Sequence, residues 1–144
     1  MTGDRLGAGQ QAMAMAGPAA AGGGSGDERA AIVIVDRDAG EREILHGELS
    51  KRYGVDYSIV VCDEPAELDT RMKELIGAGT PVALVIGGVG GADPDGIEVL
   101  ARVRGIDATA SRVAAVRWGE WDTARPIFDA ISMGKIDHWV MRPV

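Results

Sequence analysis

The chain has 144 residues, of which 46% are hydrophobic, and a formal net charge of −7. This length suffices for one domain with one sizeable core. The acidic balance argues against a nucleic-acid surface, which needs clustered Lys and Arg. No apolar run approaches the roughly 20 residues that a membrane span requires. Cys62 is the single cysteine, so an internal disulfide and a Cys-x-x-Cys zinc framework are excluded in this segment. We therefore expect a cytoplasmic protein with neither nucleic acid nor a membrane among its partners.

Residues 1–29 are rich in Gly and Ala and hold few bulky apolar side chains. Such a segment cannot bury enough surface to offset its ordering entropy, so we predict a disordered tail ahead of a domain over 30–144. A secretory signal fits poorly, because Asp4 stands where basic residues belong and the apolar stretch is weak.

Strands and helices alternate along the rest of the chain. The expected strands are Ala31–Val35, Tyr57–Cys62, Val82–Ile86, Arg112–Val116 and His138–Met141. The expected helices are Ala39–Tyr53, Glu64–Ala78, one from Ile97 onward, and Asp122–Met133. Repeated strand–helix–strand units imply right-handed crossovers and a parallel sheet, hence an α/β fold. The sequence ends at Val144, directly after the fifth strand, where a further helix should cover the sheet, so we expect a fragment of a longer protein.

Each helix carries an apolar face and a stop signal. The apolar faces are Ile44, Leu45 and Leu49 in the first helix, Leu68, Met72, Leu75 and Ile76 in the second, and Ile97, Val99, Leu100 and Val103 in the third. Gly54 and Gly79 follow the first two helices, where a C-terminal cap glycine belongs.

The stretch from Pro81 to Gly96 is the organising feature, because a buried strand runs into a glycine-punctuated loop and then a helix. In open α/β sheets, ligands bind beside such loops, yet no side chain marks the end of this strand. The pattern Gly88-x-Gly90 lacks the third glycine of the dinucleotide fingerprint, which favours a plain loop over a phosphate cradle. Asp93 and Asp95 could form a metal or acceptor pair, although a turn and a helix N-cap are the commoner outcome.

Residues 31–144 resemble a receiver domain of bacterial response regulators. The resemblance is carried by the strand ending at Asp36, by DGIEVL at 95–100, and by a basic residue before Pro143. It implies a flavodoxin-like three-layer sandwich with strand order 2-1-3-4-5, whose last helix is missing from this chain. RYGVDY at 52–57, GTPVAL at 79–84 and DHWVMRP at 137–143 resemble a subgroup in which the receiver precedes a thioredoxin-reductase-like flavoprotein.

The resemblance also places the family's phosphorylation pocket on residues that cannot perform its chemistry. The phosphoacceptor position falls on Gly88, or on the equally empty Gly87 if the alignment shifts by one. The metal-binding acidic pair falls on Asp36 and Arg37, the hydroxyl position on Val116 and the lysine position on Arg142. A hard divalent cation prefers oxygen ligands, so only Asp36 keeps its role. An arginine would then pair with Asp36 or Asp38 and balance charge in the pocket.

Aromatic and large apolar residues late in the chain are candidates for a switch or an interface. They are Trp118, Trp121, Ile127, Phe128, Ile131 and Trp139. Trp139 matches the family's switch aromatic, although packing on the sheet edge is the simpler interpretation. His46 and His138 have no partner at ligand spacing, Cys62 is expected to be a small buried apolar group, and the Arg142–Pro143 peptide is expected to be cis, as in the family.

Three functions remain open at this stage. The first is a non-phosphorylatable pseudo-receiver that regulates or contacts a C-terminal enzyme domain, with no cofactor in this segment and with FAD and NAD(P) in the missing part. The second is a signalling receiver that uses Asp36, Asp38 or Asp93 as an unconventional acidic site. The third is a scaffold that forms homodimers through its sheet edge and helical face.

Overall fold

A computed structural model describes residues 29–90, 95–116 and 121–141, the side chains of 121–124 excepted. The strands are β1 (Ala30–Val35), β2 (Tyr57–Cys62), β3 (Val82–Gly88), β4 (Ser111–Val116) and β5 (His138–Met141). The helices are α2 (Ala39–Tyr53), α3 (Ala66–Gly77), α4 (Gly96–Ile106) and α5 (Trp121–Ser132). Strand and helix alternate as expected. The predicted tail lies outside the described residues.

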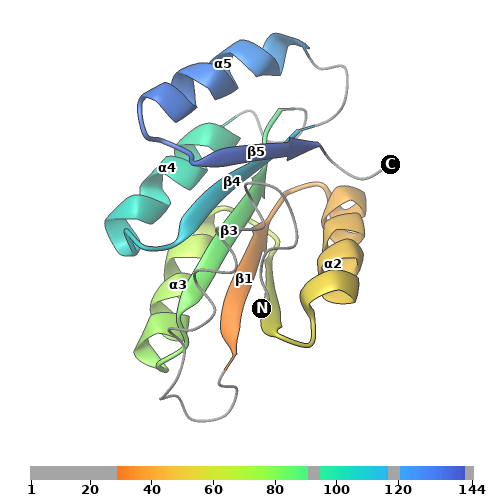
Figure 1. The fold of residues 1–144 in the computed structure, drawn as a ribbon, viewed down its shortest axis with the longest axis vertical. Coiled ribbons are helices and arrows are strands. Elements are labelled where there is room, and N and C mark those ends of the chain that lie inside the picture. The colour runs from red at the N-terminus through yellow and green to blue at the C-terminus, as the bar shows by residue number, and fades with distance from the viewer. Residues whose placement is uncertain (1–28, 91–94, 117–120, 142–144) are drawn as a thin grey trace.

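All five strands form one parallel sheet in the order β2-β1-β3-β4-β5, which confirms the expected topology (Figure 1). Strands β1 and β3 lie at the centre, and every residue of both is buried. A register shift between β1 and β3 falls between Ala31 and Ile32. Continuous apolar runs in the middle strands are what a sheet covered on both faces requires.

The two faces of the sheet carry two separate cores. Helices α3, α4 and α5 pack on one face through Leu68, Met72, Leu100, Val103 and Ile127, against strand residues that include Val33, Val85 and Ala114. Helix α2 packs on the other face through Leu45, with Leu49 and Tyr53 beside it. The result is the three-layer sandwich that the resemblance implies. No helix follows β5 within the described residues.

Two helix faces are narrower than the sequence suggests. Ile44 is 42% exposed and Ile76 is 41% exposed, so the expectation that they belong to the core is wrong. The buried stripe of α2 runs from Leu45 to Leu49, and Ile44 lies about 100° away around the helix. The same offset separates Ile76 from the stripe through Leu68 and Met72.

The two expected cap glycines end their helices by different means. Gly79 has φ of 84°, and the N–H groups of Gly79 and Thr80 donate to Ile76 and Leu75, which is a Schellman motif. Gly54 keeps a helical φ of −64°, so the left-handed cap expected there is not formed. A side chain at Gly54 would instead collide with the carbonyl of Ser50, so close packing is what requires glycine.

Element ends also shift slightly. Helix α3 begins at Ala66 instead of Glu64, with Pro65 at its N-cap. Strand β3 continues past Ile86 to Gly88, because Gly87 and Gly88 pair with Ala114 and Ala115 of β4. Among the described residues, no helix is long and apolar enough to cross a lipid bilayer.

Candidate functional site

The carboxyl edge of the sheet brings together three of the five predicted pocket positions. Val35 pairs with Gly87 and Gly88 pairs with Ala115, so Asp36 follows β1 beside Gly88. Val116 ends β4, opposite Met141 of β5. Parallel strands necessarily present their carboxyl ends at one edge, so this convergence follows from the topology.

Asp36 is fully buried and holds the loop that follows β1. Its Oδ1 accepts a hydrogen bond from the N–H of Asp38 at 2.9 Å. The guanidinium of Arg42 donates to the backbone oxygen of Asp36 at 2.8 Å. Asp38 in turn caps α2, because its Oδ1 accepts from the N–H of Glu41 at 3.0 Å. Both carboxylates therefore stabilise the start of α2.

Arg37 links three loops at this edge. Its Nη1 lies 2.9 Å from Oδ1 of Asp95, and its Nε lies 3.7 Å from Oε1 of Glu64. The hydrogen bond from Arg37 holds the pKa of Asp95 below its usual value. Asp95 stands at the N-cap of α4, but its side chain makes no capping bond, contrary to the expected cap role. The sequence analysis named neither Asp95 nor Glu64 as a partner of Arg37.

The glycines of β3 settle which position faces the pocket edge. A Cβ at Gly87 would lie 3.1 Å from Val35 and 3.2 Å from Leu100, both in the core under α4. An acceptor there would point into apolar packing, so the alignment on Gly88 is the better one. A Cβ at Gly96 would collide with the carbonyl oxygen of Gly88, which explains why α4 can begin so close to the end of β3. The sequence analysis quoted Gly96 but did not predict this close approach.

This residue set does not fit the magnesium ion that the fold family uses. Among the five pocket positions, only Asp36 has a side-chain oxygen, and the neighbouring position holds the cationic Arg37. Mg²⁺ sites are built from carboxylate and other oxygen ligands. The residues that the structure describes contain no group of three or more His, Cys, Asp or Glu placed to hold a metal ion.

Several predicted positions lie outside the described residues. They are Asp93, Trp118, Arg142 and the Arg142–Pro143 peptide, together with the side chain of Trp121. Val116 is buried in the core beneath α4, as a hydrocarbon side chain at that position should be.

Of the predicted interface residues, three are accessible and one is not. Phe128 is 57% exposed, and Ile131 and Trp139 are also exposed. Ile127 is 2% exposed and belongs to the core, so its assignment to a contact surface is wrong. A residue pointing to the sheet and one 100° around the helix cannot be told apart without knowing how α5 is oriented.

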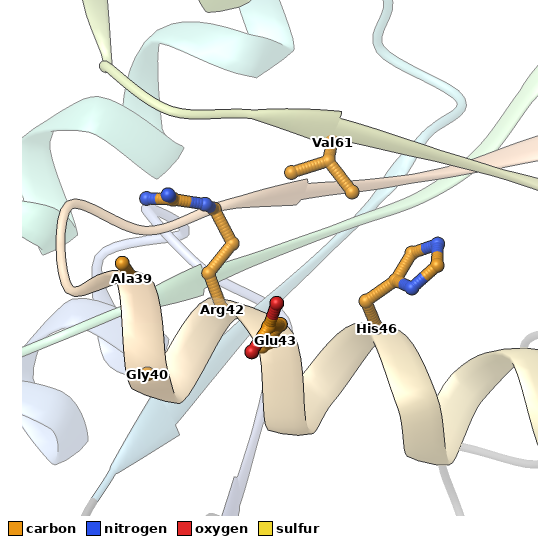
Figure 2. Close-up of a pocket in the computed structure, with 6 residues that line it drawn as sticks. All are labelled: Ala39, Gly40, Arg42, Glu43, His46 and Val61. Carbon is orange, nitrogen blue, oxygen red and sulfur yellow. The ribbon is translucent and has the colours of Figure 1, made fainter.

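An open hollow of about 320 Å³ lies between α2 and β2, away from the pocket edge. Figure 2 shows its lining, in which Arg42, Glu43 and His46 from α2 flank Val61 of β2. Arg42 is already engaged there with the backbone oxygen of Asp36 and, at 3.5 Å, with Asp63. His46 is exposed, as expected.

Cys62 is buried, as expected, and burial raises the pKa of its thiol to about 11. The thiolate is the reactive form of cysteine, so the thiol should be unreactive at neutral pH. We expect a thiol reagent such as Ellman's reagent to label the native chain far more slowly than the denatured chain. Rapid stoichiometric labelling of native protein would contradict this.

A buried arginine that the sequence analysis passed over anchors β4 to β5. Arg112 is 5% exposed and donates to both carboxylate oxygens of Asp137, at 3.2 and 3.1 Å, and to the carbonyls of Gly134 and Lys135. Burial raises the pKa of Asp137, but the hydrogen bonds and charge of Arg112 outweigh it, so the net shift is downward. An arginine opening a strand gave no signal for this role.

Comparison with known structures places the fold among receiver domains. A signal receiver domain from Pseudomonas fluorescens Pf-5 is 22% identical, with a TM-score of 0.56, over 80% of this chain and 83% of that chain. The chemotaxis protein CheY4 of Vibrio cholerae is 13% identical, with a TM-score of 0.61, over 81% and 88% of the two chains. The response regulator TrrA of Thermotoga maritima, in complex with Mg(2+)-BeF, is 20% identical, with a TM-score of 0.56, over 79% and 87%.

No family model matches the sequence, and no curated protein matches it. At the identities of these three structures, the likeness shows the fold. The chain has the flavodoxin-like fold of response-regulator receiver domains.

Proposed function

We propose that this chain is a pseudo-receiver, a receiver-fold module that cannot accept a phosphoryl group and acts through constant contact with another protein. The observation that carries the proposal is the Arg37–Asp95 ion pair at 2.9 Å, beside an acceptor position occupied by Gly88. A fixed guanidinium supplies positive charge at the loop where the family places a metal ligand. The nucleophile, the second metal ligand and the hydroxyl are all absent from the sequence at these positions.

The surrounding contacts support a single fixed state. In a switching receiver, a ligand shifts the population between two packings by binding one of them better. Here Arg37 connects the loops after β1, β2 and β3 through Asp95 and Glu64. Arg37 and both partners are partly exposed, so we assign this network a positional role and a small stabilising one.

The alternative of an unconventional acidic site has less support. The carboxylate of Asp38 caps α2, and that of Asp36 is buried and accepts the N–H of Asp38. An acceptor or metal ligand needs free lone pairs facing solvent, and these two groups already serve the α2 N-terminus. Asp93 lies outside the described residues.

We further propose that the module precedes an FAD- and NAD(P)-dependent disulfide reductase of the thioredoxin-reductase kind, and that the reductase is its contact partner. The support is the resemblance of residues 52–57, 79–84 and 137–143 to that subgroup. The gene sequence beyond Val144 tests this directly. A dinucleotide fingerprint and a Cys-x-x-Cys downstream would support it, and an unrelated domain would contradict it.

Beryllofluoride with Mg²⁺ tests the loss of phosphotransfer. We expect no saturable change in the amide NMR shifts of Asp36, Gly88 or their neighbours, because the nucleophile, metal ligand and hydroxyl are missing together. A working receiver domain serves as the positive control in the same buffer. Saturable shifts centred on Asp36 and Gly88 would contradict the pseudo-receiver proposal and favour the acidic-site alternative.

A further inference from the structure

The exposed large apolar residues of the described chain are concentrated on α5 and β5. Six of the nine lie there: Phe128, Ile131, Met133, Trp139, Val140 and Met141. The other three, Ile44, Val55 and Ile76, lie on separate elements and form no patch. A contiguous apolar surface of this kind on a folded domain marks an interaction site.

Strand β5 forms the centre of this surface and is an edge of the sheet. Its only neighbour is β4, so one row of backbone N–H and C=O groups along β5 has no strand partner in the sheet. Natural proteins protect such edges with charged side chains, prolines or bulges. Within His138–Met141 there is no proline, lysine, arginine or carboxylate.

Both faces of this edge are apolar and accessible. Trp139 and Met141 pair with Ala114 and Val116, which face the core under α4 and α5, whereas Val140 pairs with Ala115 on the opposite face. The three side chains are 39%, 40% and 38% exposed. The other edge strand, β2, differs because its side chains are buried or half-buried beneath α2 and α3.

The charges beside β5 are neutralised within the chain. Asp137 is held by Arg112 at 3.1 Å, and Lys135 is held by Glu98 at 2.8 Å. The chain as a whole carries a net charge of −7, so two copies repel each other over most of their surface. The β5 edge is a locally balanced apolar strip where two copies can approach at low electrostatic cost.

We infer that β5 pairs with β5 of a second copy of this chain, antiparallel about a two-fold axis at Val140, so that one sheet runs through the dimer. Two identical edges are self-complementary in this arrangement, and a two-fold contact closes without forming filaments. Residues directly opposite on antiparallel strands share a face. Val140 therefore meets its own symmetry copy, and Trp139 meets Met141. The inference rests on the proposed function, since a module of constant contact needs a permanent surface.

The oligomeric state of the full chain, measured by sedimentation velocity, tests the inference first. We expect a concentration-dependent dimer that Val140→Lys abolishes, because the substitution places a charge on the two-fold axis. Ile76→Lys is the matched control, since Ile76 is equally exposed but lies on α3, and it should leave the dimer intact. A wild-type chain that stays monomeric, or a dimer that survives Val140→Lys, would overturn the inference.

Cross-linking tests the register and does not depend on how Val140→Lys folds. Under mild oxidation, Val140→Cys should form an intermolecular disulfide much faster than Ile76→Cys, because opposed Cβ atoms on the axis are within bonding reach. The buried Cys62 should not compete. Equal cross-linking of the two variants would refute the pairing. The beryllofluoride test of phosphotransfer reads Gly88 and not β5, so the two proposals can fail separately.

Discussion

Replacing Arg112 with methionine should lower the free energy of unfolding by about 3 kcal/mol, as expected when one partner of a buried, hydrogen-bonded charge pair is removed. Arg112 is 5% exposed and binds Asp137 and the carbonyls of Gly134 and Lys135. Methionine fills a similar volume but satisfies none of these groups. Urea denaturation followed by circular dichroism measures the loss.

Arg104→Met is the matched control, because Arg104 is exposed and reaches the same Gly134 carbonyl at 3.4 Å. Its cost should stay within about 0.5 kcal/mol, the usual range for surface substitutions. Similar losses in the two variants would show that the β4–β5 anchor does not depend on Arg112.

The effect of Arg112→Met should also depend on pH. The pKa of Asp137 is depressed in the folded chain, so its ionised form contributes stability above the ordinary aspartate pKa. That contribution is lost as the pH falls through the depressed folded value. The difference between wild type and Arg112→Met should therefore shrink in acid and stay constant through the neutral range. A difference that grew in acid would contradict the assigned ion pair.

The sheet was predictable because its signals are local. Each strand is a short apolar run, and the alternation with helices leaves few topologies. The end of β3 was less predictable, since Gly87 and Gly88 extend the strand through backbone pairing with β4 that no side-chain pattern records. Exposed Ile44 and Ile76 were misassigned because apolar residues at the border of a helix stripe look like part of it.

At the site, the sequence predicted which strand ends meet but not how the side chains pair. The partner of Arg37 is Asp95, 58 positions later, and that of Arg112 is Asp137, 25 positions later. Neither separation matches a local spacing rule, and a charged residue near a strand end usually faces solvent. Only the packing of α4 against β3, and of β5 against β4, brings these charges together.

Restoring the missing groups should restore binding of a phosphoryl mimic. Arg37→Asp returns the second acidic ligand, Gly88→Asp the acceptor, and Val116→Thr the hydroxyl, beside the native Asp36. Glycine at 88 is not held in the left-handed region, so an aspartate there is compatible with the backbone. We expect the triple variant, with Arg142→Lys added, to bind beryllofluoride only when Mg²⁺ is present, as detected by ¹⁹F NMR.

The order in which the groups are restored separates the roles of the pocket residues. Gly88→Asp alone should not bind, because Arg37 and its ion pair with Asp95 still occupy the position of the metal ligand. Arg104→Asp combined with Gly47→Asp adds the same charges on exposed helix positions and controls for weak, non-specific Mg²⁺ binding. If the restored variant folds but binds no better than this control, the edge formed by Asp36, Gly88 and Val116 is not a disabled phosphorylation pocket. If Gly88→Asp alone binds, Arg37 does not block the metal, and the loss of the acceptor by itself accounts for the inactive pocket.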